Sequence, residues 1–88
     1  MIDHREEPIR ETWYHGGAAE TWELQKEDGT PVSVGARISN DRGTFTIQGG
    51  SPPMHSGSTG RIFVRFGSGW EQEFYPIVFG LIWRRIHV

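Results

Sequence analysis

Hydrophobic and polar residues alternate with a period of two along much of this chain. The alternating segments are 20–25, 31–39, 43–49, 61–66 and 70–75, and a last apolar segment covers 81–88. In 43–49, for example, Phe45 and Ile47 fall on one parity and threonines on the other. This period is that of a half-buried strand, so each segment predicts a β-strand.

Turn-forming residues separate these segments. The runs KEDGTP, NDRG and GSG combine Gly with Asp, Asn, Ser or Pro, the residue types that tight turns favour. Pro76 ends the strand over 70–75, and YPIVFG predicts one helical turn. We therefore expect an all-β fold, a small five-stranded SH3-like barrel. The expected order is a strand, a long connection, three strands joined by progressively tighter turns, a one-turn helix, and a last strand that pairs back to the first.

The first residues differ from the rest in composition. Residues 1–11 are charged, contain Pro8 and have no sustained apolar period, so they predict a flexible acidic N-terminal arm. Residues 12–88 are short enough to form one domain, which we expect to be the barrel.

Large aromatic residues are numerous for a chain of this length. Those expected in the core are Trp22, Phe45, Phe66, Trp70 and Phe74. Among those not assigned to the core are Trp13, Tyr14, Phe63, Tyr75 and Trp83. Phe63 lies on the same face of its predicted strand as Arg61 and Arg65, and Tyr75 lies on the same face as Glu71 and Glu73. Exposed aromatic side chains among Arg and Glu are typical of a protein interface or a stacking surface.

Four segments carry a resemblance: TPVSVGARISNDRGTFTIQGG, STGRIFVRF, WEQEFYP and VFGLIW. Together they resemble a group of small proteins encoded by bacteriophages of actinobacteria, over residues 29–83. The shared features are a Val-x-Val-Gly opening, a loop ending Gly-Ser-Thr-Gly-Arg, and an aromatic-Pro turn leading to Phe-Gly-Leu. The resemblance implies a viral accessory protein in the host cytoplasm, and it implies no particular activity.

Charge is distributed unevenly along the chain. Residues 1–28 carry eight acidic residues against three basic ones, and residues 29–88 carry three acidic residues against six arginines. Such asymmetry is a reason to consider an anionic partner, because the planar guanidinium group of Arg donates paired hydrogen bonds to carboxylates and phosphates.

The run GGSPPMHSGSTGR, residues 49–61, is the longest connection between predicted strands. It is not a P-loop, because the pattern requires a Lys and a following helix, whereas Arg61 opens a strand. Its Gly and Ser amides can form an anion-binding nest to which His55 and Arg61 add charge. Alternatively, the run only spans two strands. Long loops are often functional, so we expect the first site of binding here.

Two further groups of charged residues have structural and functional interpretations. Arg61 and Arg65 would lie across from Glu71 and Glu73 on adjacent strands, which most simply makes solvated cross-strand ion pairs. Near the end of the chain, Trp83 precedes a basic tip formed by Arg84, Arg85 and His87. That tip suits phosphate contact, or is only a solvated chain end.

Several function classes are disfavoured. The chain has no Cys, which excludes disulfides and thiolate chemistry, and its four His show no metal-ligand spacing, so we expect neither metal nor cofactor. The most apolar stretch, FYPIVFGLIW, is too short to span a bilayer. Glu71 and Glu73 lack the cleft that paired catalytic carboxylates need, and we expect no enzyme.

We therefore expect a binding module that engages a protein, either a host factor or a second copy of this chain. Its candidate residues are His55, Arg61, Phe63, Arg65, Tyr75, Trp83, Arg84 and Arg85. The alternative is a binder of nucleic acid or of a phosphate-bearing ligand, which would use Arg61, Arg65, Arg84 and Arg85.

Overall fold

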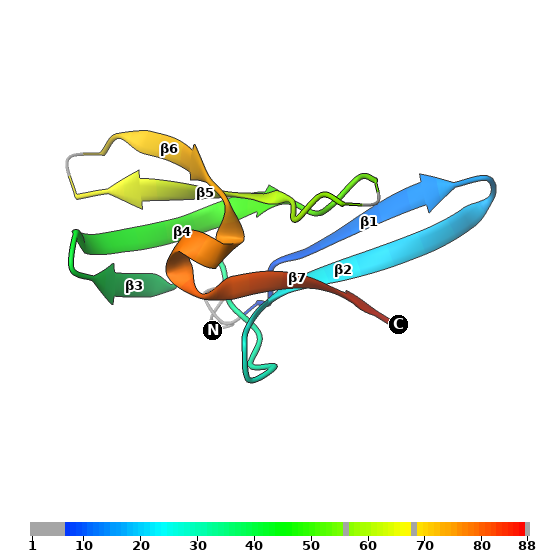
Figure 1. Cartoon of the computed structure of the whole chain (residues 1–88), viewed down its shortest axis with the longest axis horizontal. Coiled ribbons are helices and arrows are strands. Elements are labelled where there is room, and N and C mark those ends of the chain that lie inside the picture. Colours follow the sequence, from blue (N-terminus) through cyan, green and yellow to red (C-terminus); the bar gives the residue numbers. More distant parts are fainter. Residues whose placement is uncertain (1–6, 56, 68, 88) are drawn as a thin grey trace, which may run out of the picture.

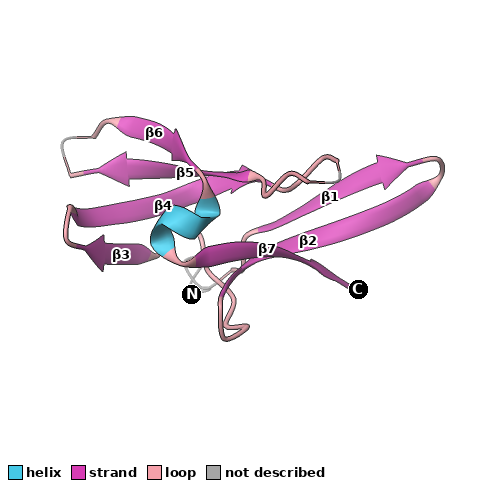
Figure 2. Cartoon of the chain, viewed as in Figure 1, coloured by secondary structure: helices cyan, strands magenta, loops and turns pink. Residues whose placement is uncertain are grey.

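The computed structural model describes residues 7–55, 57–67 and 69–87, and nearly all of its regular elements are β-strands (Figure 2). The strands are β1 (Arg10–His15), β2 (Ala18–Lys26), β3 (Arg37–Asn40), β4 (Gly43–Ser51), β5 (Arg61–Phe66), β6 (Glu71–Phe74) and β7 (Leu81–Ile86). Before β7 the chain forms a 3-10 turn, η2 (Pro76–Phe79). The predicted all-β class and the helical turn before the last strand are confirmed.

The strands form two antiparallel sheets (Figure 1). One has the strand order β1-β2-β7 and the other β3-β4-β5-β6. The last strand pairs with β2, which contains the first strand that the sequence predicts. The described residues do not form a closed barrel: β7 lies at the edge of one sheet and β6 at the edge of the other. The expected five-stranded closure is therefore absent from the described residues.

The segment 31–36 connects the two sheets. The N–H of Val32 donates to the carbonyl of Leu24 at 2.9 Å, and the N–H of Gly35 donates to the carbonyl of Ile47 at 2.8 Å. Gly35 has a φ of +85°, a conformation that bends the chain between these two contacts. Only the end of the predicted strand over 31–39 is therefore regular, as β3.

The hairpin of β1 and β2 was not predicted by the alternation pattern. Gly16 and Gly17 have φ values of +55° and +86°, so they form a two-residue turn of the kind that matches the twist of antiparallel strands. The hairpin extends away from the rest of the chain (Figure 1).

The expected N-terminal arm is partly within the fold. Its residues 1–6 lie outside the described residues. Ile9 is only 4% exposed and belongs to the core, and Arg10 and Glu11 begin β1. A single apolar residue, Ile9, therefore anchors a segment whose composition is otherwise typical of a solvated arm.

The predicted turns are capped by short polar side chains. In the connection after β2, the carboxylate of Asp28 accepts a hydrogen bond from the N–H of Thr30 at 2.9 Å. Hydrogen bonds from the side chain and the backbone of Thr30 hold the pKa of the Asp28 carboxyl below its usual value. Between β3 and β4, the side-chain oxygen of Asn40 accepts from the N–H of Arg42 at 2.8 Å. Both contacts are the local capping that Asp and Asn provide in turns.

The core lies between the two sheets and takes residues from both. Its buried members are Ile9, Leu24, Val32, Phe45, Ile47, Ile62, Val64, Leu81 and Trp83. Among the rings expected in the core, Phe45 is buried and Trp22, Phe66 and Phe74 pack against it partly buried. The expectation for Trp70 is wrong: this residue precedes β6 and is 67% exposed, with its ring beside that of Phe66 at 5.8 Å between centroids.

Trp83, on β7, packs against the four-stranded sheet. A Cβ atom at Gly50 would lie 2.9 Å from the Trp83 ring, and one at Gly60 would lie 2.7 Å from it. The indole N–H of Trp83 donates to the carbonyl of Arg61 at 3.1 Å. The indole of β7 therefore lies directly against the backbone at the end of β4 and the start of β5.

We predict that Gly50→Ala lowers the free energy of unfolding by about 2–3 kcal/mol, because the added methyl overlaps the Arg61 carbonyl and the Trp83 ring. Urea unfolding measures this. Gly67→Ala is the matched control, since Gly67 also has no positive φ and a Cβ there meets nothing within 4 Å. Its effect should stay within about 0.5 kcal/mol. Equal stabilities of the two variants would contradict the packing described.

Candidate functional site

The connection between β4 and β5 is shorter than the run of Gly, Ser and Pro suggests. Residues 49–51 belong to β4, where Gly50 pairs with Ile62, so the connection covers 52–60. Pro52 is fully buried. The N–H of Ser58 donates to the carbonyl of His55, and the N–H of Gly60 donates to the Ser58 hydroxyl, both at 3.2 Å. The connection is thus folded and held locally, not merely slack chain.

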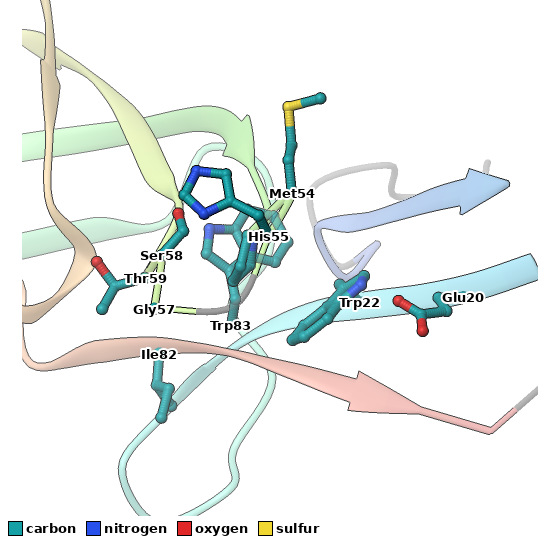
Figure 3. Close-up of a pocket in the computed structure, with 10 residues that line it drawn as sticks. Glu20, Trp22, Met54, His55, Gly57, Ser58, Thr59, Ile82 and Trp83 are labelled. Atoms are coloured by element: carbon teal, nitrogen blue, oxygen red, sulfur yellow. The ribbon is translucent and has the colours of Figure 1, made fainter. Parts of the chain in front are cut away.

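A cleft of about 560 Å³ lies between this connection and the three-stranded sheet (Figure 3). Its lining residues are Glu20, Trp22, Pro53, Met54, His55, Gly57, Ser58, Thr59, Ile82 and Trp83. Binding clefts for small ligands and for anchoring side chains measure about 300–1,000 Å³ and are mostly apolar. In both size and lining, this cleft is the best candidate binding site among the described residues.

The register of β2 and β7 places the two indoles of the cleft on one face. Leu24 lies opposite Trp83, and Trp22 lies two residues before Leu24, so all three side chains point to the same side of the sheet. Trp83 is buried, whereas Trp22 is half-buried and projects from β2 in Figure 3. Trp83 therefore forms the base of the cleft and Trp22 one wall.

The polar rim of the cleft is nearly neutral. The carboxylate of Glu20 forms an ion pair with the guanidinium of Arg85, 3.2 Å away. On the opposite wall, Met54 is 61% exposed, and His55, Ser58 and Thr59 add polar groups. A charged ligand gains little here, because an exposed ion pair already offsets the only carboxylate in the lining. An apolar side chain fits this lining better.

Four of the candidate residues lie elsewhere, on the outer face of β5 and β6. The guanidinium of Arg61 stacks on the Tyr75 ring, 4.0 Å from its centroid, and lies 3.5 Å from the Glu73 carboxylate. Arg65 pairs with Glu71 at 2.9 Å, and Phe63 lies between the two arginines on the same face. The predicted cross-strand ion pairs are confirmed.

The two arginines near the end of the chain also lie apart from each other. Arg84 and Arg85 are neighbours on a strand, so their side chains lie on opposite faces of the sheet. Arg84 donates to the backbone carbonyl of Glu27 at 3.1 Å, whereas Arg85 pairs with Glu20 at the cleft. The arginines therefore do not converge on one point where a phosphate would be held.

Of the candidate residues, the structure thus places His55 and Trp83 in the cleft and Arg85 at its rim, and it separates the others from it. Sequence reasoning missed Met54 and Ile82, and it assigned Trp22 to the core alone. The alternation pattern gives the face of each strand, but it carries no signal that 52–60 folds over the face of β2 and β7.

A second, smaller cleft of about 220 Å³ opens at the far end of the four-stranded sheet. Its lining residues are Asn40, Arg42, Phe45, Phe66, Gln72, Phe74, Val78 and Phe79. Its phenylalanines pack edge to face on one another, with Phe45 and Phe79 at 5.1 Å and Phe74 and Phe79 at 5.3 Å between centroids. This cleft is formed where phenylalanine rings in and around the core reach the surface.

Among the described residues, no helix is long and apolar enough to cross a membrane. No three His, Asp or Glu residues within the described ranges are placed to hold a metal ion.

Comparisons with known proteins add no relative: no family model, no curated protein and no solved structure matches this chain. The candidate site is therefore inferred from the geometry of this chain alone.

We predict that Trp83→Phe lowers the free energy of unfolding by about 1–3 kcal/mol, because the Arg61 carbonyl loses its donor and the smaller ring leaves space at the base of the cleft. Trp70→Phe, at an exposed position, is the control and should change stability by less than about 0.5 kcal/mol. Thermal and urea unfolding measure both. Similar losses for the two variants would contradict the structural role of Trp83.

Proposed function

We propose that this protein is a non-enzymatic accessory binding module of a bacteriophage, acting in the host cytoplasm, and that it binds a segment of a protein partner in the cleft beside 52–60. The observation that carries the proposal is the apolar lining of the cleft by Trp22, Trp83 and Met54. The viral origin and the location rest on the resemblance over residues 29–83.

The ligand that fits this cleft is an extended peptide segment with an aromatic or aliphatic anchor. Large apolar side chains enter pockets lined by indole and thioether groups, and such anchors supply most of the affinity at protein interfaces. Ser58, Thr59 and His55 border the apolar lining and offer polar groups to a peptide backbone.

We also propose that the two sheets are an open variant of the SH3-like arrangement. Three features support this relation: the segment 31–36 contacts both sheets, the 3-10 turn η2 precedes the last strand, and β7 pairs with β2. The hairpin strands β1 and β6 would then be additions to that arrangement.

The alternative, a binder of nucleic acid or phosphate, has weaker support. Each of its four arginines already contacts an acidic side chain or a backbone carbonyl, and they lie on different faces. An additional phosphate would have to compete with these partners. The alternative is therefore not favoured.

The peptide site is tested with peptides selected from a displayed random library on the immobilised full chain. We expect selected peptides to contain an aromatic or aliphatic anchor, and Met54→Thr to weaken their binding by about tenfold. Phe63→Thr is the matched control, because Phe63 is also an exposed apolar residue but lies on the outer face of β5. Calorimetry or tryptophan fluorescence measures the affinities.

Two outcomes would overturn the proposed site. One is that no peptide is selected by the folded chain. The other is that Phe63→Thr weakens binding as much as Met54→Thr, which would move the site to the outer face of β5 and β6.

For the alternative, we predict that the chain does not retain a single-stranded oligonucleotide, even at low ionic strength, because Arg61, Arg65, Arg84 and Arg85 already have partners. Fluorescence anisotropy with a labelled oligonucleotide measures this. Binding that weakens steeply as salt is added would refute the prediction and favour a nucleic-acid function.

A further inference from the structure

The outer edge of β1 is an unpaired strand edge. β1 pairs only with β2 in the three-stranded sheet, and none of the described residues pairs with its other side. Its sequence, RETWYH, contains strand-favouring Thr, Trp and Tyr and neither Lys nor Pro. Proteins usually protect such an edge, because its free N–H and C=O groups can pair with another strand.

The hairpin register determines which backbone groups are free. The two-residue turn at Gly16 and Gly17 makes the odd-numbered residues of β1 the ones that bond to β2, in agreement with the bond from the Leu24 N–H to the Ile9 carbonyl. The N–H and C=O groups of Arg10, Thr12 and Tyr14 therefore point outward. Pro8, which has no N–H, ends this free edge.

We propose that β1 pairs antiparallel with β1 of a second copy across a two-fold axis at Thr12. In this register Thr12 lies opposite the second copy's Thr12, and Arg10 lies opposite the second copy's Tyr14. All the outward backbone groups of these residues then find partners. The two sheets join into one continuous sheet with the order β7-β2-β1-β1-β2-β7. The proposal is independent of the peptide site.

Side-chain chemistry favours this register over its neighbours. Arg10 would lie beside the ring of the second copy's Tyr14, which is 79% exposed in the single chain. An arginine over an aromatic face is attractive, and it forms here without loss of the ion pair between Arg10 and Glu23. A shift of one pair in one direction sets Glu11 opposite the second copy's Glu11, which is repulsive, and a shift in the other direction leaves Arg10 unpaired.

The other face of the joined strands is also complementary. Glu11 would lie opposite the second copy's Trp13, whose buried indole N–H has no acceptor among the described residues. Along the axis, the Thr12 hydroxyl already hydrogen-bonds the Thr21 hydroxyl at 3.1 Å, so the dimer extends a row of threonines across four strands. The two-fold axis is perpendicular to the sheet, so both clefts open on the same face of the dimer.

Sedimentation velocity over a range of concentrations tests the dimer. We expect the full chain to sediment with twice its monomer mass, and Thr12→Lys to raise the dissociation constant by about tenfold or more, because it places two ammonium groups directly opposite each other. Thr44→Lys is the matched control: Thr44 is an exposed strand threonine with a cross-strand hydroxyl bond to Ser39 at 3.0 Å, but it lies in the other sheet. The Thr44→Lys variant should dimerise with the same dissociation constant as the unmodified chain.

A cysteine variant tests the register independently of any loss of stability. The chain contains no Cys, so a single Thr12→Cys substitution can only form a disulfide between two copies. Opposed residues of a hydrogen-bonded pair lie about 5.5 Å apart at Cα, within the range of a disulfide. In Arg10→Cys the two thiols would be offset by four residues, about 14 Å along the strands, and should not cross-link.

Three results would overturn the proposal. They are a monomeric unmodified chain at every concentration, a dimer that Thr12→Lys leaves intact or that Thr44→Lys weakens equally, and cross-linking of Arg10→Cys in preference to Thr12→Cys.

Discussion

The packing of the Trp83 indole against the backbone of Gly50 and Gly60 is the contact on which the two sheets depend. No side chain separates the ring from β4 and from the start of β5, and the indole N–H is bonded to the Arg61 carbonyl at the same place. A large ring and two glycines form a complementary pair here, because close packing has no room for a second side chain. The position of β7 relative to the four-stranded sheet follows from this contact.

The cleft follows from the same contact. Because Trp83 holds both ends of the 52–60 connection close to β7, the connection folds over the sheet face that carries Trp22. The glycines and Pro52 are thus structural, whereas Met54 and His55, farther from the base, are exposed to a ligand. One segment therefore combines a rigid base with an accessible rim, as binding loops on a stable scaffold commonly do.

Charge has a smaller role than the composition suggests. Four of the six arginines after residue 28 contact an acidic side chain or a backbone carbonyl, as Arg65 does with Glu71 and Arg85 with Glu20. Such exposed ion pairs contribute little stability, about 0–1 kcal/mol each. Among the described residues, the two surface features that the structure leaves open to a partner most clearly are the apolar cleft at Trp22 and the backbone edge of β1.

Local chemistry made much of the fold predictable. The alternation of apolar and polar residues located β4, β5, β6 and β7. The turn Asn-Asp-Arg-Gly is specified locally by the side chain of Asn40, and the helical turn η2 by the ring of Pro76. The strand β1 was missed, because its charged residues resemble those of a solvated arm and only Ile9 is anchored in the core. The cross-strand pairs of Arg61 and Arg65 were predictable too, since neighbouring strands in one hairpin determine them.

Tertiary structure alone decided the site. The meeting of Trp22, Met54 and Trp83 brings together residues far apart in the chain, and no local pattern encodes that distance. That the described residues form two open sheets and no closed barrel is likewise a long-range result, since it depends on whether the edges of β6 and β7 pair. The sequence by itself determined which side of each strand is apolar, because side-chain direction alternates residue by residue. Which apolar sides meet was decided by packing between segments, above all by the single indole that fits against two glycines.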